Sequence, residues 1–244
     1  MGRCIVITGA GSGLGRSLAR RLAQDGDTVV LLGRTRARLD AVAAELGGGS
    51  YSVVCDVASA DSVRTAFAAI AERHPGIDVL INNAGVYQPS FVKDATDAQI
   101  GVAVMTNFAG PVYCSRAVIP MMQRGGHIIN ISSETVGLPH AMFSLYQSSK
   151  AALERFTEAL HAELEPDGIR VTMVRAGQMM DEDSKSPVTG ELARTFAEEN
   201  LKRGLDLRTR PISSFSSVAD VLRMLIHLPG DVNVPQLILE ARHP

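Results

Sequence analysis

The stretch TGAGSGLG, at residues 8–15, decides how the rest of this sequence folds. It follows a short apolar segment, Arg3–Thr8, and leads into a helical pattern over Leu14–Gln24. Glycines in a strand-to-helix turn let the backbone approach a pyrophosphate at the positive end of the helix. The alternative is a turn that only packs the strand closely against the helix. Four glycines within seven residues, directly after the first strand, favour the pyrophosphate site.

The spacing of these glycines separates the turn from two common nucleotide-binding motifs. It reads G-x-x-x-G-x-G, whereas the usual dinucleotide fingerprint reads G-x-G-x-x-G. It also misses the P-loop pattern, because Ala10 stands at the first glycine of that window and Arg16 at its lysine. The sequence therefore argues against a nucleoside triphosphatase.

Apolar strand patterns alternate with helical patterns along the whole chain. The predicted strands are Arg3–Thr8, Thr28–Leu32, Tyr51–Cys55, Asp78–Ile81, His127–Ile131, Ile169–Val174 and Gln236–Glu240. The predicted helices are Leu14–Gln24, Arg36–Leu46, Ala60–Glu72, Asp97–Thr106, Gly110–Gln123, Ser144–Glu165, Glu191–Arg203 and Ser217–His227. This pattern predicts one α/β domain over residues 1–244. We expect a doubly wound Rossmann fold, with a mostly parallel seven-stranded sheet and helices on both faces.

Composition narrows the classes of partner. The 244 residues are 45% hydrophobic and 20% charged, with a net charge of -2. This balance leaves no excess of cations for nucleic acid, and no apolar run approaches the length of a membrane span. The three cysteines, Cys4, Cys55 and Cys114, are predicted to be buried free thiols in a cytoplasmic protein. The six histidines show no HxxxH or HExxH pairing, so we predict no metal site.

The turn after the second strand bears on the choice of nucleotide. An NAD site carries an acidic residue there to bind the ribose 2′-hydroxyl, but this chain has Gly33 followed by Arg34. A guanidinium suits a 2′-phosphate, so we interpret Arg34 as a phosphate ligand. Arg36 and Arg38 are interpreted as a solvated helix face.

Polar residues also follow the third, fourth and fifth strands, where ligands of such sheets bind. Asp56 could accept a hydrogen bond from an adenine amino group, or it could be a turn or capping residue. The turn NNAG at residues 82–85 has a composition common in turns. Ser133 could polarise a carbonyl group or simply form a turn.

Tyr146 and Lys150 lie four residues apart in the helix predicted over Ser144–Glu165, so they share a face. A cation about 4 Å from a phenol, at an effective dielectric constant near 20, favours the phenolate by about 4 kcal/mol, or about 3 pKa units. Lys150 could therefore lower the pKa of Tyr146 toward the range of a neutral-pH acid or base. The alternative is a surface lysine one turn from a half-buried tyrosine.

Taken together, these motifs resemble the short-chain dehydrogenase/reductase family in its single-domain form. The resemblance covers nearly the whole chain. The resemblance rests on the glycine-rich turn at residues 8–15, the NNAG turn, Asn107, and Ser133, Tyr146 and Lys150, which have the family's spacing. It implies an NADP(H)-dependent oxidoreductase that transfers a hydride between nicotinamide and a carbonyl or secondary alcohol.

The resemblance also assigns roles to single residues. Tyr146 would be the general acid or base, and Lys150 would lower its pKa and hold the nicotinamide ribose. Ser133 would bind the substrate oxygen, and Asn107 would hold a water in the proton path. The implied cofactor residues are Gly9, Ser12, Gly13, Leu14, Gly15, Arg34, Asp56, Val57, Asn83, Ala84, Gly85, Tyr146, Lys150, Gly177 and Met179.

Two positions after the sixth strand depart from the family pattern. Ala176 stands where the family has proline, and Asp181 stands where it has a threonine that contacts the cofactor. A carboxylate beside a pyrophosphate is unfavourable unless it points away. We expect the backbone amides of residues 178–180 to take over the threonine's role.

The segment 181–210 is predicted to be a substrate-binding lid. Apolar side chains near Tyr146 are expected to line an adaptable substrate pocket; they are Met142, Phe143, Leu145, Met179 and Met180. By resemblance we expect a homodimer or homotetramer, with the helices Gly110–Gln123 and Gln147–Glu165 as the interface. Two alternatives stay open. One is a non-catalytic NADP(H)-binding redox sensor, and the other is an epimerase or dehydratase on the same fold.

Overall fold

One parallel sheet contains all seven strands of the described residues, which are 2–181 and 188–243 of this computed structural model. Its order is β3-β2-β1-β4-β5-β6-β7. The strands are β1 Cys4–Thr8, β2 Thr28–Gly33, β3 Tyr51–Val54, β4 Val79–Asn82, β5 His127–Ser133, β6 Arg170–Ala176 and β7 Gln236–Leu239. Every neighbouring pair is parallel. The predicted doubly wound fold is thus confirmed.

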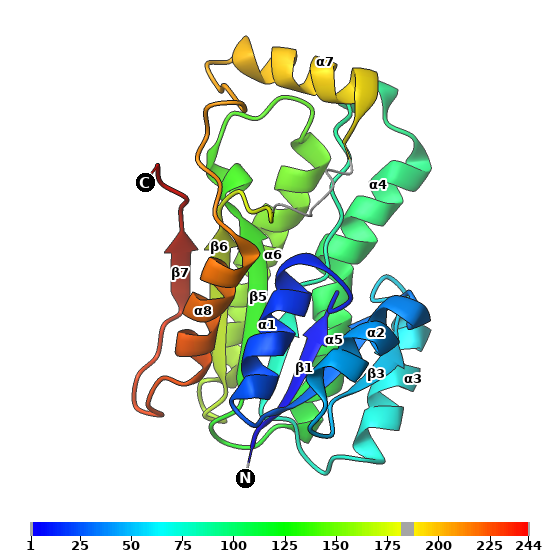
Figure 1. Cartoon of the computed structure of the whole chain (residues 1–244), viewed down its shortest axis with the longest axis vertical. Helices are drawn as coiled ribbons and strands as arrows, with labels where there is room; N and C mark the ends of the chain where they lie inside the picture. The colour runs from blue at the N-terminus through cyan, green and yellow to red at the C-terminus, as the bar shows by residue number, and fades with distance from the viewer. Residues whose placement is uncertain (1, 182–187, 244) are drawn as a thin grey trace.

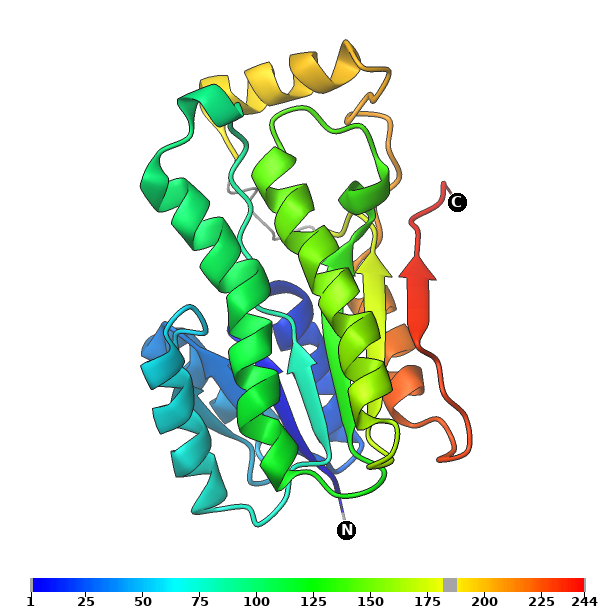
Figure 2. The ribbon, with the colours of Figure 1, turned by 180° about the vertical axis from the view of Figure 1, so that it is seen from behind.

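Helices cover both faces of the sheet. The bounds are α1 Gly13–Gln24, α2 Arg36–Leu46, α3 Ala60–Ala71, α4 Asp97–Val104, α5 Gly110–Val118, α6 Ser144–Leu164, α7 Gly190–Leu201 and α8 Phe215–Ile226. Figure 1 shows α1, α2 and α8 on the near face, and Figure 2 shows α3, α5 and α6 on the other. Helix α7 crosses above the carboxyl ends of the strands instead of packing on a face.

The central strands are apolar because both of their faces are covered. Every residue of β1, β4 and β5 is buried. On one face they pack against the apolar sides of α1 and α8, and on the other against α3, α5 and α6. Helix α1 shows the matching pattern, with Leu14, Leu18 and Leu22 buried at helical spacing. Burial on two sides explains why these strands do not alternate between apolar and polar residues.

The strand order reverses its direction of growth at β1. Strand β2 lies on one side of β1 and β4 on the other, so the connections leave in opposite directions. The turns after β1 and β4 therefore meet at the carboxyl edge, which is the position where ligands bind in open parallel sheets.

Most element boundaries differ from the sequence prediction by a few residues, and two of these differences lie next to the site. Strand β5 continues through Ser133 because it pairs with β6 as far as Ser133 and Ala176. The helices α4 and α5 were expected to be separate, but a π-helical turn over Met105–Ala109 joins them. Such wide turns are rare and often occur at functional sites.

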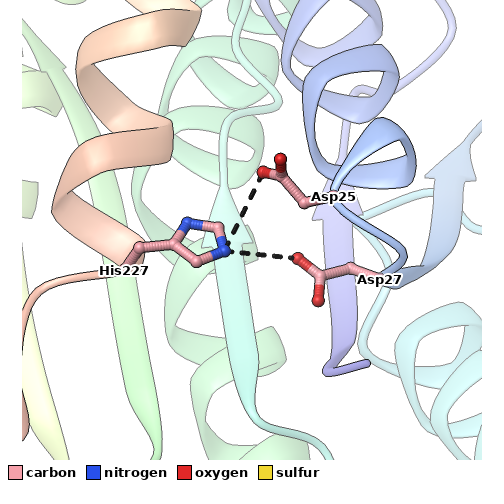
Figure 3. Close-up of side chains that lie close together, drawn as sticks. All are labelled: Asp25, Asp27 and His227. Carbon is pink, nitrogen blue, oxygen red and sulfur yellow. Dashed lines mark ion pairs between the residues drawn. The ribbon is translucent and has the colours of Figure 1, made fainter. Parts of the chain in front are cut away.

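The opposite, amino end of the sheet carries a charge cluster drawn in Figure 3. Nε2 of His227, at the end of α8, lies 3.8 Å from Oδ2 of Asp25 and 3.9 Å from Oδ2 of Asp27. Nε of Arg223 donates to Asp25 Oδ2 at 2.5 Å, and this bond is the largest cause of the lowered pKa of Asp25. The cluster joins the end of α8 to the turn between α1 and β2.

Two sequence predictions, on the state of the cysteines and on membrane-spanning segments, can be compared with the structure. Cys4, Cys55 and Cys114 are buried free thiols, as predicted, and burial raises the pKa of each. Within residues 2–181 and 188–243, no helix is both long and apolar enough to cross a bilayer.

Candidate active site

A polar cavity of about 270 Å³ opens at the carboxyl ends of β1, β2, β3 and β4. Eight of the predicted cofactor residues line it: Gly9, Ser12, Arg34, Asp56, Val57, Asn83, Ala84 and Gly85. Leu14 and Gly15 lie just behind it, buried in the first turn of α1. The cavity lining also includes residues that the sequence analysis did not assign to the cofactor, namely Gly11, Gly33, Thr35, Arg38, Leu39, Cys55, Val86 and Thr106.

The glycine-rich turn has the shape of a cradle that side chains would fill. Gly9 has a φ of +68°, and a Cβ there would lie 2.9 Å from the Cα of Ala84 in the turn after β4. A Cβ on Gly15 would lie 2.6 Å from the carbonyl oxygen of Gly9. The turns after β1 and β4 can therefore approach each other only where these residues lack side chains.

The side chain of Thr8 fixes the turn after β4. Its hydroxyl oxygen accepts hydrogen bonds from the backbone N–H groups of Asn83 and Ala84, each at 3.0 Å. In return, Nδ2 of Asn83 donates to the Thr8 carbonyl at 2.9 Å. The NNAG sequence thus holds the two strand ends together instead of forming an isolated turn.

Two arginines line the cavity at the end of β2. They are Arg34, as predicted, and Arg38, which the sequence assigned to the solvated face of α2. Arg38 is exposed, as assigned, but it also lines the cavity. Arg36 is exposed and lies outside the lining, with its Nη1 4.0 Å from Oδ1 of Asp40. Among the described residues, neither Arg34 nor Arg38 has an ion-pair partner. This pair of free guanidinium groups fits a phosphate at the cavity mouth.

The structure shows the turn role of Asp56, and its contact with an adenine amino group stays a prediction. Its Oδ1 accepts from the N–H of Ala58 at 3.1 Å, which makes it a turn residue, and the residue also lines the cavity. One carboxylate oxygen stays available for a ligand donor.

Asn107 lies in the π-helical turn and is fully buried. Its Oδ1 accepts from the N–H of Val86 at 2.8 Å, and its Nδ2 donates to the Val86 carbonyl and to Oγ of Ser149. The Ser149 hydroxyl in turn donates to the carbonyl of Tyr146 at 2.7 Å. The side chain of Asn107 therefore ties the chain after β4 to the first turn of α6.

Ser133 and Tyr146 come together across the end of β5 and the start of α6. Oγ of Ser133 accepts from the N–H and the hydroxyl of Thr135, at 3.3 and 3.1 Å. The Ser133 proton is thus free to be donated, and the hydrogen bond with Ser133 partly offsets the rise that burial causes in the pKa of Tyr146. Nε2 of Gln147 donates to the carbonyls of Thr135 and Leu138, which fastens the turn after β5 to α6.

Lys150 is buried beneath this pair. Its Nζ donates to the carbonyl of Ile131 in β5 at 2.7 Å. Burial lowers the pKa of Lys150 to about 8, and the charge of Glu154, one turn further along α6, acts in the opposite direction. Glu154 itself accepts from Ser132 at 2.6 Å and pairs with Arg175 at 2.5 Å. No pattern in the sequence indicated this network.

The expected effect of Lys150 on Tyr146 is not met. Burial raises the pKa of Tyr146, the Ser133 hydrogen bond opposes this, and the nearby Tyr87 adds to it, but Lys150 is not among the causes. The estimate from the sequence placed the two charges about 4 Å apart and neglected desolvation, which disfavours both charged forms.

The structure shows the surroundings of the segment after β6, where the sequence departs from the family pattern. Asp181 turns toward α8, where its Oδ1 accepts from the N–H of Phe215 at 3.0 Å. The amides of residues 178–180 were expected to replace the threonine, but two of them are already used. The N–H of Gln178 donates to Glu134 at 3.1 Å, and that of Met180 to the carbonyl of Ser213 at 3.0 Å. That expectation is therefore wrong for Gln178 and Met180.

A second, larger cavity of about 490 Å³ adjoins Ser133 and Tyr146 and is bounded above by α7. Three of the five predicted pocket residues, Phe143, Met179 and Met180, line it, as does Gly177. Met142 is buried outside the lining, and Leu145 faces a separate small hollow. Of the predicted lid 181–210, residues 182–187 lie outside the described residues.

The chain is similar to known dehydrogenases over nearly its whole length. A family model described as short chain dehydrogenase matches residues 3–189. A serine 3-dehydrogenase of Agrobacterium fabrum is 30% identical, with 98% of this chain and 94% of that protein covered. An NADP-dependent 3-hydroxy acid dehydrogenase of Salmonella typhi is 29% identical, with 94% and 91% covered. The solved closed form of a serine dehydrogenase complexed with NADP+ has a TM-score of 0.82 and 27% identity, with 97% of this chain and 94% of that chain covered.

Proposed function

The chain belongs to the short-chain dehydrogenase family of NAD(P)-dependent oxidoreductases, and we propose that it is an NADP(H)-dependent carbonyl reductase or alcohol dehydrogenase. The observation that carries this proposal is the convergence of Ser133, Tyr146 and Lys150 at one end of β5. Hydrogen bonds hold the parts of this site in place. Thr135 donates to Ser133, Gln147 fastens the turn after β5 to α6, and Lys150 donates to the carbonyl of Ile131.

Each of the three side chains has a different role in the reaction at the substrate carbonyl group. Ser133 donates a hydrogen bond to the substrate oxygen and stabilises the negative charge that develops there. Tyr146 gives its proton to the same oxygen in reduction and takes it back in oxidation. Lys150 is held by its hydrogen bond to the carbonyl of Ile131, and its pKa of about 8 leaves it mostly charged at pH 7. Nicotinamide, when bound, supplies or accepts the hydride at the carbonyl carbon.

The first cavity supports NADP(H) as the cofactor. Its glycine cradle leaves space for a pyrophosphate at the start of α1, and Asp56 offers an oxygen to an adenine amino group. Arg34 and Arg38 provide two unpaired guanidinium groups where a 2′-phosphate would lie. The NADP-dependent relatives agree with this choice.

We expect the proton path from Tyr146 to run past Lys150 toward Asn107. The backbone carbonyl of Asn107 cannot receive the usual α-helical hydrogen bond, because the residue four positions later is Pro111, which has no N–H. A carbonyl in that position suits a water molecule that connects the buried site to bulk solvent.

A spectrophotometric assay tests the proposal. Purified protein is mixed with NADPH or NADH and a panel of ketones, aldehydes, quinones and acyl thioesters, and the loss of reduced nicotinamide absorbance is followed. We expect turnover with NADPH. Tyr146→Phe should reduce kcat by at least about 100-fold, the usual contribution of a positioned acid, and leave the NADPH affinity nearly unchanged. Tyr113→Phe, in α5 and outside both cavities, is the matched control.

The assay also separates the proposal from its rivals. Tight NADPH binding without turnover of any carbonyl would favour a redox sensor. An epimerase or dehydratase would retain nucleotide through purification and show no net loss of NADPH. The convergence of Ser133, Tyr146 and Lys150, of which Ser133 and Lys150 are buried, favours the reductase over the sensor.

Assembly and location follow the family resemblance. We propose a cytoplasmic homodimer or homotetramer in which α5 and α6 form the interface. These helices lie side by side on one face of the sheet (Figure 2). Light scattering that shows only a monomer would contradict this assembly.

A further inference from the structure

Aromatic rings surround Tyr146 on the side of the larger cavity. The ring centroid of Phe143 lies 5.4 Å from that of Tyr146, and the ring of Tyr87 lies 6.0 Å from it. Phe196, on α7, packs against Phe143 at 4.6 Å, and His140 stacks on Phe196 at 6.3 Å. Rings at these separations attract one another and form a continuous wall that presents apolar faces.

The backbone holds this wall in place. Met142 has a φ of +59°, an uncommon conformation for a residue with a side chain, and its carbonyl accepts from Ser90 at 2.9 Å. This bend precedes Phe143 directly. The fully buried Asn200 of α7 accepts from the N–H of Ala141 at 3.1 Å, so the helix that carries Phe196 is fastened to the same loop. Such a preformed wall lowers the entropy cost of binding a rigid apolar group.

The charges around the cavity disfavour an anionic substrate. His140 donates through Nδ1 to Asn200 at 3.0 Å, and burial lowers its pKa, so its ring is neutral at pH 7. Glu134 is negative and is already paired with Arg210 at 2.7 Å. Among the described residues that line the cavity there is no lysine or arginine. Arg210 lies outside the lining and its charge is already balanced by Glu134, so a substrate carboxylate would gain no unpaired cation of the described lining.

We propose that the substrate is a neutral ketone or aldehyde that carries an aromatic ring or a similar apolar group, which packs against Phe143 and Phe196. This proposal rests on the reductase function proposed above. It separates the chain from the relatives named for serine and for 3-hydroxy acids, compounds that carry a carboxyl group. The cavity, at about 490 Å³, is of the size that holds ligands much larger than a four-carbon acid.

Four related compounds test ring and charge separately: acetoacetate, ethyl acetoacetate, benzoylacetate and ethyl benzoylacetate. Each reduction consumes one NADPH and one proton and forms one secondary alcohol, so the loss of NADPH reports turnover directly. We expect ethyl benzoylacetate to have the highest kcat/KM. Each ester should exceed its acid by at least about tenfold, and each phenyl compound should exceed its methyl counterpart by about tenfold.

A substitution in α7 tests whether the aromatic ring of the substrate packs against Phe196. Phe196→Ala should lower kcat/KM for ethyl benzoylacetate by about tenfold, mainly through KM, and leave ethyl acetoacetate within about twofold. Leu192→Ala is the matched control, because Leu192 lies on the same helix with its side chain exposed and outside the cavity. If Phe196→Ala does not fold, Phe196→Leu keeps the helix packed and should give a smaller loss in the same direction.

The possible outcomes test the substrate inference separately from the proposed reductase function. Acids that react as well as their esters, or phenyl compounds no better than methyl compounds, would overturn the inference and leave the reductase function intact. Inactivity toward all four compounds in a protein that reduces another class of carbonyl would do the same. Inactivity toward every carbonyl would overturn the reductase function as well.

Discussion

The preference for NADPH over NADH should depend on Arg34 and Arg38. Both arginines line the nucleotide cavity and have no ion-pair partner among the described residues. The only difference between the two nucleotides is the 2′-phosphate, so a residue that binds this phosphate changes the ratio of the two affinities. Arg36 lies between them in the sequence but faces Asp40, and it therefore provides a control of the same chemical type.

The expected magnitude follows from the exposure of these arginines. A hydrogen bond to a charged group contributes about 1.5–3 kcal/mol when sheltered, whereas exposed ion pairs contribute less than about 1 kcal/mol. Arg34 and Arg38 lie at an open cavity mouth, so we take about 1–2 kcal/mol for each. This corresponds to a loss of about 5- to 30-fold in NADPH affinity per arginine.

The measurement is a fluorescence titration of NADPH and NADH against the wild type and three variants. Arg34→Ala and Arg38→Ala should weaken NADPH binding and leave the NADH dissociation constant within about twofold. Arg36→Ala should leave both unchanged. Added salt should weaken NADPH binding more than NADH binding, because it screens the additional phosphate. An unchanged affinity ratio in both Arg34→Ala and Arg38→Ala would refute the assignment of this phosphate site.

Three further predictions concern the site and its supports. Glu154→Gln removes the anion that raises the pKa of Lys150 from within α6, so the loss of activity at alkaline pH, expected near pH 8, should move to lower pH in the kcat/KM profile. Gly15→Ala places a Cβ 2.6 Å from a carbonyl oxygen and should cost about 1–3 kcal/mol of stability and weaken nucleotide binding, as measured by denaturant unfolding and titration. Arg223→Gln should lower the melting temperature at pH 7. The difference should fade as the pH falls through the lowered pKa of Asp25, because a depressed carboxyl pKa stabilises the fold only above it.

The location of the site could be predicted because parallel strands bring their ends to one edge. The turns after β1, β2, β3 and β4 were separate weak signals in the sequence. Once the alternation of strands and helices predicts a parallel sheet, each of these turns must lie at the same edge. Eight predicted residues line one cavity for this reason.

The choice between Arg36 and Arg38 shows what such reasoning leaves undetermined. Residues two apart on a helix point about 200° away from each other, so only one of them can face the cavity. Which one does so depends on the rotation of α2, which is set by its buried residues Leu39 and Val42. The sequence alone placed both arginines in solvent, and packing placed Arg38 at the cavity.

Clusters assembled from distant segments were also outside the reach of sequence patterns. Asp25 and Asp27 meet His227 about two hundred positions later in the chain, and Glu154 meets Arg175 across two elements. Our prediction of no metal site relied on spacings within one segment, which cannot detect such a group. It stays a prediction.

Desolvation decides how the buried pair is charged at neutral pH. Burial opposes both the phenolate of Tyr146 and the ammonium of Lys150, yet the two pKa shifts have different consequences. A raised pKa keeps the proton on Tyr146, and a lysine pKa of about 8 still leaves Lys150 mostly charged at pH 7. The site therefore holds a proton ready for transfer to a carbonyl oxygen, which is the state that reduction requires. Oxidation requires the opposite state of the phenol. Because the pKa of Tyr146 is raised, the oxidation rate should rise at a higher pH than the pH near 8 at which Lys150 loses its charge and the reduction rate falls.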